Sequence, residues 1–474
     1  MKKSLVALIA LFVSILFILP SCKPSTEGPE KITDAATLWK KINEKMSSLD
    51  SYEATAEIQM VFDIGGYAVN SNATEKRIES GRQTDSPYFY SDASYSVSCK
   101  DLGIDEQLSE LSAYYNGNAF MSTKAKDVEQ KLYSAMTAKE YQDYILEKTT
   151  LSDTGDILNA SNVTFEQTEN EAWTICCSNY SDEVLQKYIN EFDTEEMSLG
   201  ENISDMELSV SADKDFRATL LSIKFVFDTE ADEKIQKKLE ATITYQKYNE
   251  ATPITETLST EDFKQVADIR VIDTVEKSIT DIQNAQQAKC TLNLKQSFTL
   301  RGETSTYEEK DIITYGGKGD SYYYKIQATS QGSTFSMNYK NGSETVSQGS
   351  TTTSKNKTPE EAKEFIDSLI NSAKYSKNSV ENVEKIGDGI YKLECRVIDA
   401  TPYKNVFDSI RGEYTGATQT ITVTIEEGKV VKVESIVEAK GTYQYQNAIY
   451  RTTLIVETSC TYEIIDTTEE SSQL

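Results

Sequence analysis

Hydrophobic and polar positions follow two patterns along the chain. After Asp34, apolar residues recur at helical spacing and predict an amphipathic helix. They are Leu38, Ile42, Met46 and Leu49, and Asp34 is the predicted N-cap. From residue 54 to residue 62 every second position is apolar, a period typical of a strand with one buried face. The second half of the chain repeats the helical stripe and the alternating strand: Val275, Ile279 and Ile282, then Cys290, Leu292 and Leu294.

Further landmarks recur in the same order in both halves. Thr137–Glu140 and Thr358–Glu361 are capping boxes, in which a threonine and a glutamate satisfy the first amides of a helix. Asn-Gly dipeptides, typical of hairpin turns, begin at Asn116 and Asn341. Three more segments match in pairs: 87–90 with 321–324, 173–177 with 391–395, and 208–211 with 421–424. We therefore predict two copies of one domain, each with a helix, several antiparallel strands, a second helix and more strands.

The first 21 residues have the composition of a targeting segment. Lys2 and Lys3 precede a nearly unbroken apolar run, 5–19, that is too short to cross a bilayer. The run ends in the tetrapeptide LPSC, which resembles the bacterial lipobox and places Cys22 at its cysteine. The resemblance implies that Cys22 is the mature N-terminus, linked to diacylglycerol and carrying acyl chains such as palmitate, on the outer face of the cell membrane. The alternative is an ordinary secretory signal with a chance cysteine.

Net charge narrows the choice of partners. The chain has 48 Lys+Arg against 76 Asp+Glu, a net charge of −28, which argues against binding to nucleic acid. Loss of Lys2 and Lys3 with the signal takes the charge to −30, so the body should not lie flat on anionic lipid. Residues 23–30, rich in proline and charge, are predicted to be a spacer between the anchor and the first domain.

Candidate chemistry is sparse. The chain has no histidine, which excludes histidine-based catalytic triads and histidine-ligated zinc or iron. It has no C-x-x-C, P-loop or calcium-loop motif, and among its many carboxylates no pair is singled out for glycosidase chemistry. We interpret 193–196 as a solvated face and 213–215 as a hairpin tip. We therefore expect a protein that is not an enzyme and that has no cofactor, no metal site and no catalytic residue.

Six cysteines remain besides Cys22: Cys99, Cys176, Cys177, Cys290, Cys395 and Cys460. We interpret them mainly as small buried apolar residues, although their even number permits disulfides outside the cytoplasm. Cys176 and Cys177 should point to opposite faces of a strand.

Two aromatic runs, 88–90 and 322–324, could stack on sugars or line an apolar groove. Ordinary strand packing is the favoured interpretation, with one face of each run exposed or binding something.

Element order and short phrases resemble a known family. The phrase SLDSY (48–52) leading into a strand, the tyrosine-rich Asn-Gly hairpins and the late capped helix resemble Gram-positive surface lipoproteins related to the periplasmic lipoprotein carrier and the mycobacterial lipid-carrier lipoproteins. The resemblance implies an α+β fold with two tandem copies of a curved antiparallel sheet, a half-barrel, with helices packed on its concave face. The expected order is a signal peptide at 1–21, a tether at 22–33, half-barrels at 34–250 and 266–466, a linker at 251–265 and a polar tail at 467–474.

Two functions are compatible with this organisation. The first is a membrane-anchored extracytoplasmic protein, without enzymatic activity, that binds or carries a lipid or other apolar small ligand in a half-barrel cavity. The second is a structural or protein-binding surface lipoprotein with solid domain cores. The membrane, reached through the lipidated Cys22, is the one partner that the sequence specifies.

Overall fold

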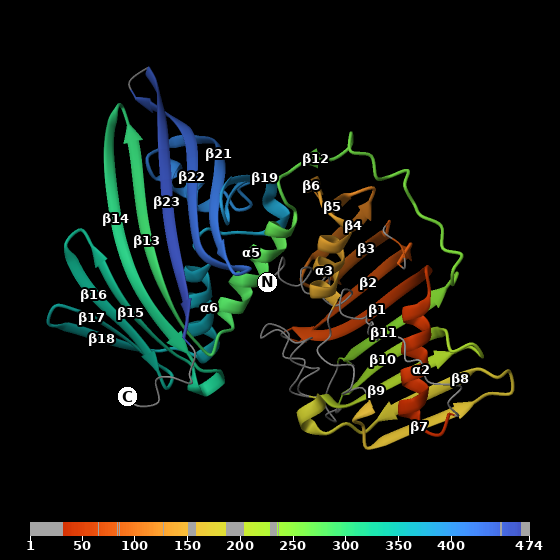
Figure 1. The fold of residues 1–474 in the computed structure, drawn as a ribbon. Coiled ribbons are helices and arrows are strands. Elements are labelled where there is room, and N and C mark those ends of the chain that lie inside the picture. The colour runs from red at the N-terminus through yellow and green to blue at the C-terminus, as the bar shows by residue number, and fades with distance from the viewer. Residues whose placement is uncertain are drawn as a thin grey trace. The chain divides into compact units, whose positions relative to one another are not determined.

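A computed structural model describes residues 32–465 except 65, 83, 85, 127, 150–157, 186–202, 228–234, 236 and 446–447. The chain forms two compact units, one ending at Lys264 and the other beginning at Gln265 (Figure 1). Cys22 and the tail at 467–474 lie outside the described residues.

The first unit is built on a twelve-stranded antiparallel sheet with the order β12-β6-β5-β4-β3-β2-β1-β11-β10-β9-β8-β7. Its strands are β1 Tyr52–Ile64, β2 Tyr67–Ser80, β3 Tyr88–Cys99, β4 Ile104–Tyr115, β5 Asn118–Ala125, β6 Val128–Ala135, β7 Asn162–Gln167, β8 Trp173–Ser178, β9 Ile203–Ala212, β10 Ala218–Phe227, β11 Lys238–Gln246 and β12 Lys264–Gln265. Helices α2 (Ala35–Ser48) and α3 (Ala138–Thr149) belong to the same unit.

The second unit is built on an eleven-stranded antiparallel sheet with the order β18-β17-β16-β15-β14-β13-β23-β22-β21-β20-β19. Its strands are β13 Gln287–Leu300, β14 Glu303–Gly316, β15 Tyr323–Ser330, β16 Ser333–Lys340, β17 Ser343–Gln348, β18 Thr351–Asn356, β19 Val380–Gly387, β20 Ile390–Cys395, β21 Gly412–Glu426, β22 Lys429–Tyr445 and β23 Ala448–Ile464. The helical segments are α5 Arg270–Gln283, α6 Pro359–Ile370 and α7 Thr401–Ser409, with short 3-10 turns at Gly319–Ser321 and Lys377–Ser379.

The two sheets share one topology, which confirms the predicted fold class of two tandem half-barrels. In each sheet the first six strands run outward in chain order, a helix follows (α3 or α6), and the next five strands return from the opposite edge. The first sheet has one more short strand, β12, which lies beside β6. The final strand of each copy, β11 or β23, pairs with the first, β1 or β13. Each strand order is linear, so both curved sheets are open (Figure 1).

The helix entries have the predicted caps. The carboxylate of Asp34 accepts a hydrogen bond from the Thr37 amide at 2.7 Å. Thr358 and Glu361 form the reciprocal bonds of a capping box at the start of α6. Thr137 and Glu140 do the same at α3. The two copies therefore use the same local signal to begin the helix that follows the sixth strand.

The Asn-Gly dipeptides form the predicted hairpin turns. Asn116 and Gly117 connect β4 to β5 with φ values of 49° and 74°. Asn341 and Gly342 connect β16 to β17 with φ values of 53° and 76°. Two consecutive positive φ angles are the requirement of a type I′ turn, and asparagine followed by glycine meets it with least strain.

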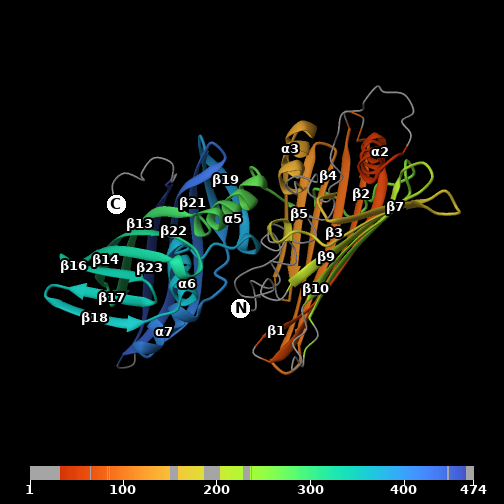
Figure 2. The ribbon, with the colours of Figure 1, turned by 90° about the horizontal axis from the view of Figure 1, so that it is seen from below.

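The helices pack on one face of each sheet. In the first unit, the α2 residues Leu38, Ile42 and Met46 are buried together with the alternating apolar residues of β1. In the second unit, α6 packs against β13 and β15, and α7 packs against β21 at the lower end of the sheet in Figure 2. Tyr315 on β14 donates a hydrogen bond to the Ile282 carbonyl of α5 at 2.6 Å, which ties that helix to the same face.

One cysteine pair corrects the interpretation from the sequence. Cys290 on β13 and Cys460 on β23 form a disulfide, although 170 residues separate them. Their two strands are neighbours only because the last strand of the copy returns to the first, and spacing along the chain does not reveal this. Cys176 is exposed and Cys177 is buried, as predicted for neighbours on opposite faces.

Candidate functional site

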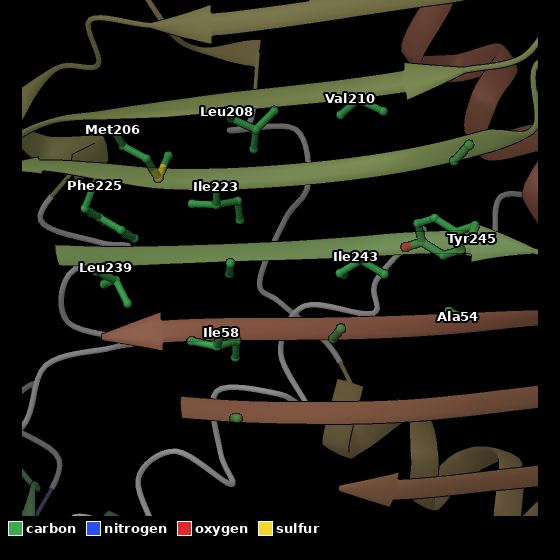
Figure 3. Packing of buried hydrophobic residues seen from close by; sticks show 14 of the residues in the cluster. Ala54, Ile58, Met206, Leu208, Val210, Ile223, Phe225, Leu239, Ile243 and Tyr245 are labelled. Atoms are coloured by element: carbon green, nitrogen blue, oxygen red, sulfur yellow. The ribbon is translucent and has the colours of Figure 1, made fainter. Parts of the chain in front are cut away.

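The concave face of the first sheet has a broad apolar half. It is formed by side chains of β9, β10, β11 and β1, which are adjacent strands although β1 lies far from the others in sequence. Figure 3 shows these side chains on one face of the four strands: Met206, Leu208, Val210, Ile223, Phe225, Leu239, Ile243, Tyr245, Ala54 and Ile58. The period of two along each strand places them in register and makes one continuous apolar surface. Each of these side chains is 7% exposed or less, because the surface lies inside the core that it shares with α2.

A buried ion pair lies on the same face, one strand beyond β1. Glu75 and Arg77 on β2 are 2% and 4% exposed, and Arg77 Nη2 lies 3.2 Å from Glu75 Oε1. The Ser91 hydroxyl on β3 donates to the same carboxylate oxygen at 2.5 Å. Burial raises the pKa of Glu75, because a charge is costly away from water, while Arg77 and Ser91 act in the opposite direction. Burial would lower the pKa of Arg77, but Glu75 and other acidic groups outweigh it and raise that pKa.

Arg82 is a second charged residue on this face, and it binds the C-terminal end of α2. Arg82 donates through Nη1 to the Met46 carbonyl at 2.8 Å, and its Nε lies 3.1 Å from Glu79 Oε2. Tyr52 donates to Glu79 at 2.6 Å. A cation on the carbonyl end of a helix complements the helix dipole, so these contacts hold α2 on the sheet.

Helix α3 covers the polar half with aromatic rings. Tyr141 stacks on Tyr114 with ring centroids 4.5 Å apart and lies 5.7 Å from the ring of Phe89. The guanidinium of Arg77 lies 5.2 Å from the Phe89 centroid on the same face. The ion pair is therefore enclosed by an aromatic layer, which favours a structural role for it.

One hydrogen bond is repeated in the two units and aligns them residue by residue. Tyr114 on β4 donates to the carbonyl of Met136, the residue before the α3 capping box. Tyr339 on β16 donates to the carbonyl of Lys357, the residue before the α6 capping box. These two bonds identify Tyr114 and Tyr339 as equivalent positions.

The second sheet also has a buried ion pair, but at a different position of its concave face. Glu344 on β17 is 3% exposed, and its two oxygens lie 2.9 Å from Lys355 Nζ and 3.1 Å from Lys357 Nζ. The Tyr324 hydroxyl donates to the same carboxylate. Burial opposes ionisation of Glu344, but these three donors hold its pKa at about 2. The group is fully satisfied and stabilises the start of α6.

The aromatic runs are packed, as the favoured interpretation predicts, but in the first run both faces are buried. Phe89 contacts α3 on the concave side, while Tyr88 and Tyr90 lie in a separate cluster with Leu258 and Phe263. The Tyr88 hydroxyl donates to the Ile254 carbonyl at 2.7 Å and accepts from its amide at 2.8 Å. The expectation of an exposed or ligand-binding face is therefore wrong for this run, because residues 254–263 fold back over it. In the second run, Tyr322 and Tyr324 are buried and Tyr323 is half-buried.

The remaining candidate residues form no reaction centre in the described chain. Residues 193–196 lie outside the described residues. Asp213 closes the β9–β10 hairpin by accepting from the amides of Asp215 and Arg217, each at 2.9 Å, which makes 213–215 the hairpin tip that the sequence predicts. Within the described ranges, no group of three or more cysteine, aspartate or glutamate side chains could hold a metal ion. No helix in those ranges is long and apolar enough to cross a membrane.

Comparison with known proteins gives only distant likenesses. No protein-family model matches the sequence, and no curated protein does. Among solved structures, a DUF1329 family protein from Desulfovibrio piger is similar at 10% identity and a TM-score of 0.18, over 41% of this chain and 93% of that one. A protein from Nitrosomonas europaea described as a putative AttH matches at 9% identity and a TM-score of 0.13, over 86% and 92% of the two chains. Pseudomonas aeruginosa OpdQ matches at 7% identity and a TM-score of 0.14, over 87% and 98%. These values assign the chain to no family.

Proposed function

We propose that this chain is an extracytoplasmic lipoprotein, anchored through Cys22, that binds or carries a lipid or other apolar ligand on the concave faces of its half-barrels. The observation that carries the proposal is the apolar surface across β9, β10, β11 and β1 (Figure 3). An apolar surface of this extent on the inner side of an open sheet suits a hydrocarbon chain, because apolar contact supplies most of the binding energy of such ligands. We propose no enzymatic activity, since the buried charges described above are satisfied by their neighbours.

The disulfide supports an extracytoplasmic location. Cys290 and Cys460 join the first and last strands of the second sheet. Such structural disulfides form in oxidising compartments and are rare in the reducing cytoplasm. This agrees with the lipobox resemblance, which implies export and a lipid anchor at Cys22.

Charge supports a tethered body. The chain has a net charge of −28, so an anionic membrane surface repels it. Two acyl chains on Cys22 would hold it nevertheless, because each buried methylene contributes about 0.8 kcal/mol and two chains together bind stably. The proposed arrangement is a pair of ligand-binding domains held near the membrane by a flexible spacer.

Lipid co-purification tests the proposal. The full chain carrying Cys22→Ser is purified without detergent, and the organic extract is analysed by mass spectrometry. We expect a lipid at about one molecule per chain or more, and saturable binding of cis-parinaric acid, a fluorescent fatty acid, by the emptied protein. An extract free of lipid, together with no saturable binding, would reject the proposal.

A matched pair of variants then locates the site. Phe225 points to the concave face, and the next residue, Val226, points to the opposite face of β10. We expect Phe225→Ala to weaken cis-parinaric acid binding several-fold, while Val226→Ala leaves it unchanged. Equal effects of the two variants would place the ligand elsewhere.

A further inference from the structure

Strand register extends the equivalence of the two units to a buried carboxylate. Starting from the equivalent tyrosines of β4 and β16, the register leads across β3 and β15 to Glu79 on β2 and Tyr315 on β14. Four residues earlier on the same strands lie Glu75 and Asp311. Both copies therefore place a carboxylate at the same position of the concave face, and both carboxylates are buried.

The polar partners of this position differ between the copies. In the first sheet, Glu75 is bound by Arg77 and Ser91. The equivalents of these two residues in the second sheet, by the same register, are Ile313 and Ile326. The second copy has a carboxylate at this position, but it has apolar side chains where the first copy has the cation and the hydroxyl donor.

Asp311 is consequently left with an unsatisfied oxygen. The residue is 8% exposed, and its Oδ1 has no hydrogen-bond partner among the described residues. Within the same part of the chain, the carboxyl of Asp311 makes no salt bridge with a lysine or arginine, and its side-chain hydrogen bond is with Glu309. An orphaned buried carboxylate oxygen is costly, which indicates that something outside the chain completes it.

The neighbours of Asp311 define what that ligand must be. Glu309 lies two residues earlier on the same face and is half-buried, and Tyr307, two residues earlier again, is 36% exposed and donates to Glu309. The acidic groups thus lead from solvent to the buried position. The facing residues of β13 and β15 in the register are Leu292 and Ala328, both buried and apolar.

We propose that Asp311 and Glu309 bind the ammonium group of an amphipathic amine whose hydrocarbon chain packs against the apolar side chains around Asp311: Leu292, Ile313, Ile326 and Ala328. The proposal rests on the proposed function, since it names the chemistry of one ligand class for the second sheet. Two carboxylates supply a charge and several acceptor oxygens for an ammonium's three donors. They are too few for a metal ion, which takes six or more oxygen ligands when it is calcium.

Binding of two probes that differ only in the head group tests this inference. Dodecylammonium and dodecanol share one hydrocarbon chain, and each is titrated below its micellar or solubility limit into the full chain carrying Cys22→Ser, by calorimetry. We expect Asp311→Asn to weaken dodecylammonium binding about tenfold or more, since a hydrogen bond to a charged group is lost, and to leave dodecanol binding within about twofold.

Glu308→Gln is the matched control. Glu308 is exposed on the same strand, one residue from Glu309 and on the opposite face, so it loses the same charge without touching the site. Equal weakening by Glu308→Gln and Asp311→Asn would show general attraction to an acidic protein and overturn the inference. Should Asp311→Asn fail to fold, Glu309→Gln replaces it with the same expected direction.

The outcomes separate the two proposals. Dodecanol binding with no head-group preference, or a preference that survives Asp311→Asn, overturns the inference about Asp311 and leaves the apolar ligand proposal standing. Binding of neither probe by the parent chain overturns the inference about Asp311, and the proposed function is rejected as well if the same chain carries no lipid and binds no cis-parinaric acid.

Discussion

The guanidinium of Arg77 lies 3.2 Å from the carboxylate of Glu75, and both side chains are almost completely buried under helix α3. Neither charge can be removed alone without leaving the other in a medium that solvates it poorly. A buried pair of this kind adds little net stability compared with apolar residues, but breaking it is strongly destabilising.

Arg77→Leu should therefore lower the free energy of unfolding by about 3–5 kcal/mol, whereas Glu75→Leu/Arg77→Leu should recover most of the loss. Urea denaturation of the single and double variants measures both. The loss in Arg77→Leu should shrink as the pH falls through the pKa of Glu75, because the protonated carboxyl needs no cation. A double variant as unstable as the single one would contradict the argument.

Much of the architecture follows from local signals in the sequence. Thr358 and Glu361 predict the start of α6, and Asn341 predicts the β16–β17 turn. Their counterparts in the first copy predict the equivalent helix and turn. These signals are local because caps and tight turns depend on a few consecutive residues. Their repetition in order is sufficient to predict two copies of one fold.

The candidate sites could not be predicted in the same way, because they depend on which strands become neighbours. Residues 74–77 are four consecutive polar positions, and nothing local distinguishes the buried Glu75 and Arg77 from the exposed Thr74 and the half-buried Lys76. The partner of Cys290 lies at the far end of its copy. The cover over Tyr88 comes from residues 254–263, which lie between β11 and β12. In each case the chain folds back over a long separation.

Asp311 should make stability depend on pH. Burial and then the neighbouring Glu309 raise the pKa of Asp311 from 3.8 to about 6. The folded state therefore binds this proton more tightly than the unfolded state, so the stabilisation is complete below about pH 4 and is lost as the pH rises through 6. Asp311→Asn lacks this titration and should exceed the parent chain by on the order of 1–2 kcal/mol at about pH 7.5, after allowance for solvent screening.

Thermal unfolding of the parent chain and Asp311→Asn between about pH 4 and pH 8 measures this difference. It should be small at the acid end and widen through pH 6. Asp320→Asn, a change at an exposed aspartate of the same unit, should follow the parent chain throughout. A difference that does not change with pH would contradict the titration of Asp311.

Replacement of the proposed lipidated cysteine should release the protein from the membrane. The acyl chains on Cys22 would supply the attraction, since the net charge of −28 opposes contact with anionic lipid. We expect the parent protein in the membrane fraction and Cys22→Ser in the soluble or secreted fraction, with the mass of the parent N-terminus increased by a diacylglycerol group. A Cys22→Ser variant that stays with the membrane, or a parent chain cut at another residue, would refute the assignment.

The disulfide between Cys290 and Cys460 should stabilise the second unit against unfolding. Cys290 and Cys460 close a loop across 170 residues and join the strands at which the copy begins and ends. A cross-link over so long a segment restricts the unfolded chain, so reduction or Cys290→Ser/Cys460→Ser should cost about 2–4 kcal/mol. Urea denaturation with and without dithiothreitol measures the loss, and the double variant, which has no bond to reduce, is the control. If the parent chain keeps its unfolding midpoint in dithiothreitol while its mass shows two added hydrogens, the disulfide contributes nothing to stability and the strand pairing alone holds the sheet together.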